Sequence, residues 1–192
     1  MSGRASPARR IARAAAVLLA LAGPAAAQAD EALWDRLKAG GHVILIRHAL
    51  TDPGVGDPPG FRVEDCSTQR NLNAAGREEA ARLGAAFARR GIPVAQVLSS
   101  RWCRALDTAR IAFGRAQPWP ALDNTFETPQ RREPQMREVR RALTQAPAGG
   151  NLVLVTHGVN VQALSGVAPG TAEPVVMRPG ARPVTLGRLV LP

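Results

Sequence analysis

The chain is poor in the residue types that build several common kinds of site. It has no tyrosine, two cysteines, three histidines and a single lysine, Lys38, among its 192 residues. Cys66 and Cys103 do not have the paired spacing of a zinc site. Aromatic residues make up only 4% of the chain and do not alternate with dense basic runs, as they do in nucleic-acid-binding segments. We therefore expect no metal site, no other cofactor and no nucleic-acid partner.

The sequence also lacks an apolar run long enough to cross a bilayer, whose core is about 30 Å thick. The apolar stretch at 14–23 follows four arginines without an acidic residue, and small residues occupy 25–29. This order is typical of a secretory signal. We expect residues 1–29 to be a signal peptide and residues 30–192 to form one domain, in the periplasm or secreted. An uncleaved membrane anchor is the alternative.

Positive charge is carried almost entirely by arginine. The formal net charge is +10, and it is +6 for residues 30–192 because the first 29 residues hold four arginines and no acid. Such a balance favours anionic partners such as phosphates. A general preference of the coding sequence for arginine explains the excess equally simply.

Two apolar, β-branched runs, at 42–47 and 151–156, are typical of buried strands in a parallel sheet. Helices are expected at 32–39, 73–90, 102–113, 134–145 and near 160–164, further strands at 93–99, 118–122, 174–178 and 183–191, and a Pro/Gly-rich loop at 52–60. Strands that alternate with helices predict an α/β domain.

Each of the two apolar runs ends in a histidine. His48 follows Arg47 at the end of the first run, and His157 follows Thr156 at the end of the second. Ligands of open α/β sheets bind at the carboxyl ends of the strands. The two histidines should therefore emerge at one edge of the sheet and build a site there.

Four motifs together resemble a known family. They are Arg-His at 47–48, Asn-Leu-Asn-Ala-Ala-Gly at 71–76, Ser-Ser-x-x-x-Arg-Ala-x-x-Thr-Ala at 99–109, and His-Gly at 157–158. In this order the set is similar to the histidine phosphatase (phosphoglycerate mutase-like) superfamily, over about residues 40–165. The resemblance implies a three-layer α/β/α fold with a mostly parallel central sheet and, here, a minimal cap.

The residue types fit phosphoryl chemistry as well. Arginine forks neutralise and orient phosphoryl oxygens, and a neutral imidazole can attack phosphorus to give a phosphohistidine. By resemblance, His48 is the nucleophile, Arg47 and Arg104 hold the phosphate, and His157 binds it and stabilises transferred charge. Arg101 is a candidate rim cation, and His42 is expected to be structural.

Two departures from the family pattern stand out. Ala49 replaces the glycine that usually follows the nucleophile, and we expect this to be tolerated. The carboxylate that protonates the leaving group is not evident, because Gly158 stands where some relatives have an acid. The candidates for this role are Asp123 and Glu127, with Asp52 and Glu173 as further options.

The segment between Arg104 and His157 is short, so little chain is left to enclose a small substrate. An open site favours hydrolysis, since a mutase must keep water from its phosphoenzyme. We expect a metal-independent phosphomonoesterase acting on a phosphorylated small molecule or envelope glycan, without membrane insertion once the signal is removed. The alternatives are a catalytically weak module that binds anionic envelope components, and a phosphoglycerate mutase-like phosphotransferase.

The two cysteines flank the motifs. Cys66 precedes the motif at 71–76, and Cys103 is adjacent to Arg104. In an exported protein an even cysteine count permits a disulfide. A bond would fix the loop after His48 against the helix that presents Arg104, whereas two separate buried thiols are the alternative.

Overall fold

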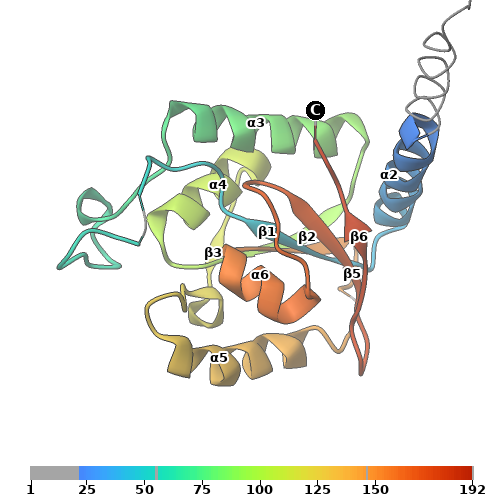
Figure 1. The fold of residues 1–192 in the computed structure, drawn as a ribbon. Coiled ribbons are helices and arrows are strands. Elements are labelled where there is room, and N and C mark those ends of the chain that lie inside the picture. Colours follow the sequence, from blue (N-terminus) through green and yellow to red (C-terminus); the bar gives the residue numbers. More distant parts are fainter. Residues whose placement is uncertain (1–21, 55, 146, 192) are drawn as a thin grey trace, which may run out of the picture.

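The computed structural model describes residues 22–54, 56–145 and 147–191. At its centre is a six-stranded sheet with the order β3-β2-β4-β1-β5-β6 (Figure 1). The strands are β1 (Val43–Arg47), β2 (Val94–Ser99), β3 (Gln117–Pro118), β4 (Asn151–Thr156), β5 (Pro174–Arg178) and β6 (Val184–Arg188). The first four run parallel to one another, β5 pairs antiparallel with β1, and β6 pairs antiparallel with β5.

Helices cover both faces of this sheet. In Figure 1, α3 (Ala74–Arg89) and α4 (Cys103–Phe113) lie on one face, and α5 (Pro129–Ala142) and α6 (Gly158–Ser165) lie on the other. Two short 3₁₀ helices, η1 (Cys66–Thr68) and η2 (Pro120–Leu122), lie in the connections. The expected three-layer α/β/α fold with a mostly parallel sheet is therefore confirmed.

The core follows from the alternation of side chains along each strand. In β1, Ile44 and Ile46 belong to the cluster beneath α3 and α4, whereas Val43 and Leu45 belong to the cluster beneath α5. Strand β4 is buried along its whole length. A strand covered on both faces must be apolar throughout, and this is why its sequence shows a continuous apolar run.

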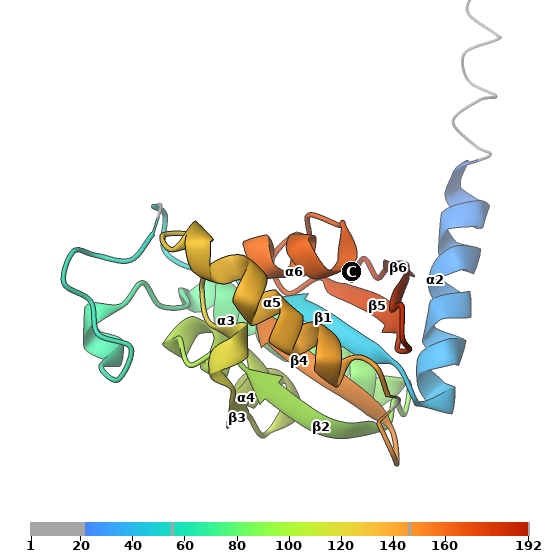
Figure 2. The ribbon, with the colours of Figure 1, turned by 90° about the horizontal axis from the view of Figure 1, so that it is seen from below.

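Helix α2 (Ala22–Ala39) is longer than the helix expected at 32–39. Leu33, Trp34 and Leu37 pack into the cluster beneath α3 and α4, while the helix start extends away from the domain (Figures 1 and 2). Most of the expected signal peptide lies outside the described residues, and α2 runs through its expected end near residue 29. In the described part of the chain, no helix has the length and apolarity needed to cross a membrane.

Besides α2, three elements differ from the sequence prediction by three residues or more at an end. The strand expected at 183–191 pairs only over Val184–Arg188. Only Gln117–Pro118 pairs as a strand, and the expected strand at 118–122 continues as η2, because Pro120 has no N–H to donate to a ladder. Helix α5 begins at Pro129, not Pro134. Both prolines are compatible with a helix start on sequence grounds, and the structure uses the earlier one and carries Pro134 inside the helix.

Candidate active site

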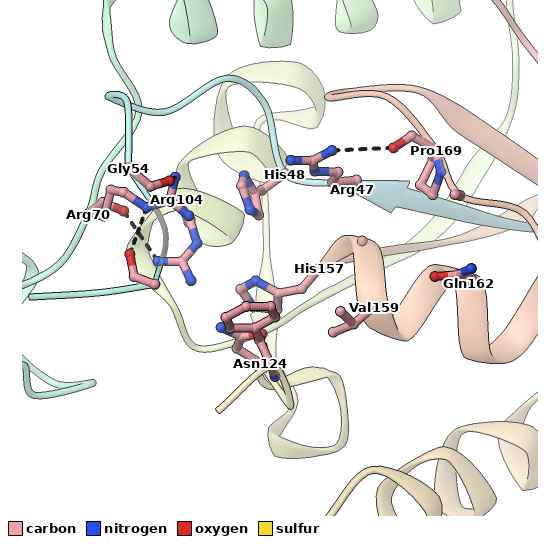
Figure 3. Close-up of a pocket in the computed structure, with 14 residues that line it drawn as sticks. Arg47, His48, Gly54, Arg70, Arg104, Asn124, His157, Val159, Gln162 and Pro169 are labelled. Carbon is pink, nitrogen blue, oxygen red and sulfur yellow. Dashed lines mark hydrogen bonds between the residues drawn. The ribbon is translucent and has the colours of Figure 1, made fainter. Parts of the chain in front are cut away.

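Parallel pairing of β1 and β4 brings the two histidines together. Arg47 is the register partner of Thr156, and the next residue, His48, donates its backbone N–H to the Thr156 carbonyl. The imidazole centroids of His48 and His157 lie 5.4 Å apart. Figure 3 shows both rings near the centre of a cleft, with Arg104 and Arg70 on one side.

The His48 ring is oriented by its own backbone. Its Nδ1 lies 2.8 Å from the Ala49 carbonyl, and because a carbonyl only accepts, Nδ1 carries the proton. The other nitrogen, Nε2, therefore has the free lone pair. Burial, together with the positive charge of Arg104, Arg47 and Arg70, lowers the pKa of His48 from 6.5 to about 3. The ring is accordingly neutral at neutral pH, the state in which an imidazole nitrogen can act as a nucleophile.

His157 is 3% exposed and is held by a hydroxyl group. Its Nε2 lies 2.9 Å from Ser100 Oγ, and the indole ring of Trp102 meets it edge-on. Burial, and then the neighbouring His48 and arginines, lower the pKa of His157 well below the ordinary value. Both histidines are thus neutral in the unliganded cleft.

Arg104 is almost completely buried, with 1% of its side chain exposed. Its Nη1 and Nη2 donate to the two carboxylate oxygens of Asp57, at 2.6 and 3.1 Å. Asp57 also accepts from the Trp102 indole at 2.9 Å and from the Arg70 backbone N–H at 3.0 Å. Neither Asp57 nor Arg70 is in the set of site residues expected from the sequence.

Arg70 orders the Pro/Gly-rich loop. Its guanidinium donates to Thr51 Oγ1 at 2.7 Å and to the carbonyl groups of Gly54 and Gly56 at 3.2 and 2.8 Å. The same side chain lines the cleft. Its place immediately before the Asn71 motif is the one sequence signal that points to it, whereas nothing in the local pattern marks Asp57 among the turn residues of the loop.

The cleft has a volume of about 370 Å³. Its walls are the two histidines and three arginines at one end and mostly neutral side chains elsewhere; the latter include Asn124, Phe126, Val159, Gln162, Ala168 and Pro169. Phe126 is 50% exposed. The cleft therefore joins a cationic end, suited to a phosphoryl group, to a less polar mouth.

The candidate proton donors take different positions. Asp123 lies outside the cleft lining and is bound by Arg101, through Nε at 2.8 Å and Nη2 at 2.6 Å. Hydrogen bonding to Asp123 raises the pKa of Arg101. Glu127 also lies outside the cleft lining; it is exposed beside Gly56, which lines the cleft, and a methyl group built on Gly56 would lie 2.7 Å from its carboxylate.

The two remaining carboxylate candidates lie elsewhere. Asp52 is exposed on the loop, and Glu173 accepts from the Gly170 N–H at 2.6 Å. Glu173 also lies 3.3 Å from Arg188 Nε, in a separate cavity. His42 lies outside the cleft, with its Nδ1 2.9 Å from the Gly40 carbonyl.

A disulfide joins Cys66 to Cys103, with their Cα atoms 5.7 Å apart. Gln69 reinforces this link, because its side-chain oxygen accepts from the Cys103 N–H while its nitrogen donates to the carbonyls of Arg62 and Val63. The segment that carries Asp57 and Arg70 is therefore attached to the start of α4, the helix that presents Arg104.

Close packing also holds the chain just after His48. Ala49 donates its N–H to Thr108 Oγ1, and its φ is not positive, so alanine fits without backbone strain. A Cβ on Gly76 would lie 1.8 Å from the Leu50 carbonyl oxygen. Glycine at 76 thus lets α3 approach the backbone that follows His48.

The residues of the cleft do not resemble a metal site. Within 22–54, 56–145 and 147–191, no group of three or more His, Cys, Asp or Glu side chains could hold a metal ion. Arginines supply the positive charge at the cationic end of the cleft.

A family model described as the histidine phosphatase superfamily (branch 1) matches residues 43–127. That range contains Arg47, His48, Arg70 and Arg104, and ends before His157. No curated protein matches the chain.

Several solved structures share the fold. A candidate phosphohistidine phosphatase, SixA from Agrobacterium tumefaciens, is 23% identical with a TM-score of 0.53, over 80% of this chain and 99% of that one. A candidate alpha-ribazole-5'-P phosphatase from Escherichia coli K-12 is 16% identical with a TM-score of 0.59, over 79% and 96%. A phosphoserine phosphatase from Entamoeba histolytica is 14% identical with a TM-score of 0.54, over 78% and 96%. Over residues 43–127 the chain is therefore similar to the histidine phosphatase superfamily, and it shares its fold with these solved structures.

Proposed function

We propose that the protein hydrolyses phosphomonoesters through a covalent intermediate on His48. The observation that carries this proposal is the orientation of the His48 ring, which leaves the Nε2 lone pair free in a cleft also lined by Arg47, Arg70 and Arg104. Arginine forks neutralise the phosphoryl oxygens that otherwise repel a nucleophile. Because three guanidinium groups supply this charge, the mechanism requires no metal ion.

The reaction has two displacements at phosphorus. In the first, the Nε2 lone pair forms the P–N bond as the P–O bond to the leaving group breaks, and the leaving oxygen takes up a proton. In the second, water attacks the phosphohistidine, the P–N bond breaks, and phosphate leaves with His48 neutral again. His157 lies beside the phosphoryl group and stabilises its charge in both steps.

Glu127 is the better candidate for the proton donor than Asp123, because its carboxylate lies beside Gly56 of the cleft lining and Asp123 is bound to Arg101. Replacement of Glu127 by Gln should slow hydrolysis of an alkyl phosphate by at least about tenfold and of p-nitrophenyl phosphate far less, since the nitrophenolate leaves without a proton. Glu133→Gln, an exposed change on α5, is the matched control. If the rate of hydrolysis fell equally for both substrates, Glu127 would not be the proton donor.

The nucleophile is tested with the purified protein lacking residues 1–29 and with the full chain. Rapid quenching with ³²P-labelled substrate should trap an acid-labile, base-stable phosphoryl protein. His48→Ala should abolish both trapping and turnover, whereas His42→Asn, outside the cleft, should retain both. Turnover by the His48→Ala protein would refute the proposal, and phosphate binding without any wild-type turnover would indicate a binding module instead.

We also propose export to the periplasm or beyond, with a phosphorylated envelope component or small molecule as substrate. The disulfide supports an oxidising compartment. Mass spectrometry of the protein from its own host should find a mature chain that starts near Gln28 or Asp30. An intact Met1 terminus in the cytoplasm would refute export.

A further inference from the structure

The carboxylate of Asp57 is buried and is surrounded by hydrogen-bond donors. Its side chain is 1% exposed and accepts four hydrogen bonds, two from Arg104 and one each from the Trp102 indole and the Arg70 N–H. Burying a carboxylate is unfavourable unless its oxygens are fully satisfied by good partners. These four bonds satisfy Asp57 and place it immediately behind the cationic end of the cleft.

The pairing with Asp57 decides which edge of Arg104 is available. A guanidinium has two edges that can bind an oxyanion in a bidentate manner, the end edge of Nη1 and Nη2 and the side edge of Nε and Nη2. Asp57 takes the end edge. Buried Nε has no hydrogen-bond partner among the described residues, although Arg104 lines the cleft. Figure 3 shows the guanidinium between Arg70 and the two histidines.

We propose that Asp57 is a positioning residue: by holding the end edge of Arg104, it directs the side edge, Nε and Nη2, to the phosphoryl oxygens of the substrate. An isolated arginine side chain has several rotatable bonds, and ordering it on binding costs conformational entropy. The Asp57 contact orders it beforehand. The inference rests on the proposed function only for the identity of the ligand, a phosphoryl group.

A carboxylate so close to a phosphate-binding arginine can also act as a competitor that the phosphate must displace. The structure favours positioning, because Asp57 has donors besides Arg104 and is tied through Trp102 and Arg70 to the segment bonded at Cys66–Cys103. Its displacement would leave the Trp102 indole N–H and the Arg70 N–H without their partner, which is unfavourable for buried donors.

The test measures binding of inorganic phosphate by titration calorimetry, alongside kcat and KM for p-nitrophenyl phosphate. Asp57→Asn should weaken phosphate binding by about tenfold, because the amide presents N–H groups to the guanidinium. Asp107→Asn is the matched control, since Asp107 lies on the same helix as Arg104 but outside the cleft, where it pairs with Arg77 of α3 and Arg110 of α4. It should leave phosphate affinity within about twofold, as expected for a surface ion pair.

A double-mutant cycle separates positioning from general destabilisation. In an Arg104→Lys background, which lacks the fork, Asp57→Asn should cost less than about threefold further affinity, because the two changes act through one interaction. The full tenfold loss in that background, or unchanged affinity in Asp57→Asn alone, would overturn the proposal. If Asp57→Asn bound phosphate more tightly than wild type, Asp57 would be competing with phosphate for Arg104, and the positioning proposal would be wrong.

If Asp57→Asn does not fold, Trp102→Phe keeps the proposal testable. It removes one donor to Asp57 without changing charge. Phosphate affinity should then fall by about threefold at unchanged circular dichroism, and unchanged affinity would count against positioning. Because phosphate binding is measured without turnover, a wild type that binds phosphate but lacks activity would refute the phosphatase proposal and leave this one standing.

Discussion

Acid should destabilise the fold through His48. Its pKa is about 3 in the folded protein, because burial and the surrounding arginines disfavour the charged ring, against 6.5 when the ring is exposed. Protons therefore bind the unfolded chain more tightly, so the free energy of unfolding falls as pH drops below about 6.5 and continues to fall to about 3. Between pH 7 and pH 5 the two pKa values give a loss of about 2 kcal/mol from this one residue.

The assay is guanidinium unfolding of wild type and His48→Asn at both pH values, followed by tryptophan fluorescence; Trp34 and Trp102 are both buried. The asparagine variant cannot take up this proton, so its stability difference between the two pH values should be smaller than that of wild type by about 2 kcal/mol. Equal differences for the two proteins would refute the reasoning. His157 remains in both proteins, and the part of its pKa lowering that comes from burial, the largest cause, cancels in the comparison.

Three further outcomes are expected. Arg104→Lys should lower kcat/KM for p-nitrophenyl phosphate by at least about tenfold, because lysine keeps the charge but lacks the planar fork of the guanidinium. Unchanged kinetics would mean that another cation binds the phosphoryl group. Replacing Cys66 and Cys103 together by alanine should lower the free energy of unfolding by about 4 kcal/mol in the chain-entropy model, measured by denaturant titration under oxidising conditions. Gly76→Ala should lower both stability and turnover, because its methyl group meets the Leu50 carbonyl; a variant with wild-type melting temperature and activity would contradict that packing.

The fold was largely predictable because its signals are local. The apolar runs of β1 and β4 end at the two histidines, and the observed register brings those ends together. Asn73, the first residue of the helix expected at 73–90, accepts from the Gly76 N–H at 2.8 Å and caps the start of α3. Such features depend on residues near one another in sequence, and they survive in the tertiary structure.

The site was predictable only in part, because its support is non-local. Arg104 and Asp57 are 47 residues apart, and no periodicity connects a helix residue to an acid in a turn-rich loop. Likewise, Asp123 accepts a hydrogen bond from Arg101, which lies 22 residues away in the sequence. Sequence patterns thus predicted that the two histidines, Arg47 and Arg104 share one cleft, but they did not indicate which partners orient these side chains.

The register between β1 and β4 sets the position of His48 relative to His157. Every residue of β1 has one partner in β4, up to Arg47 opposite Thr156, and the histidines follow one position later. Because side chains alternate between faces, a shift of one residue would exchange the core positions of Ile44 and Leu45 and would also turn His48 away from His157. A single-residue insertion in β1 should therefore destroy fold and chemistry together. Evolution can vary the loops around this centre, but it can change the length of these two strands only in concert.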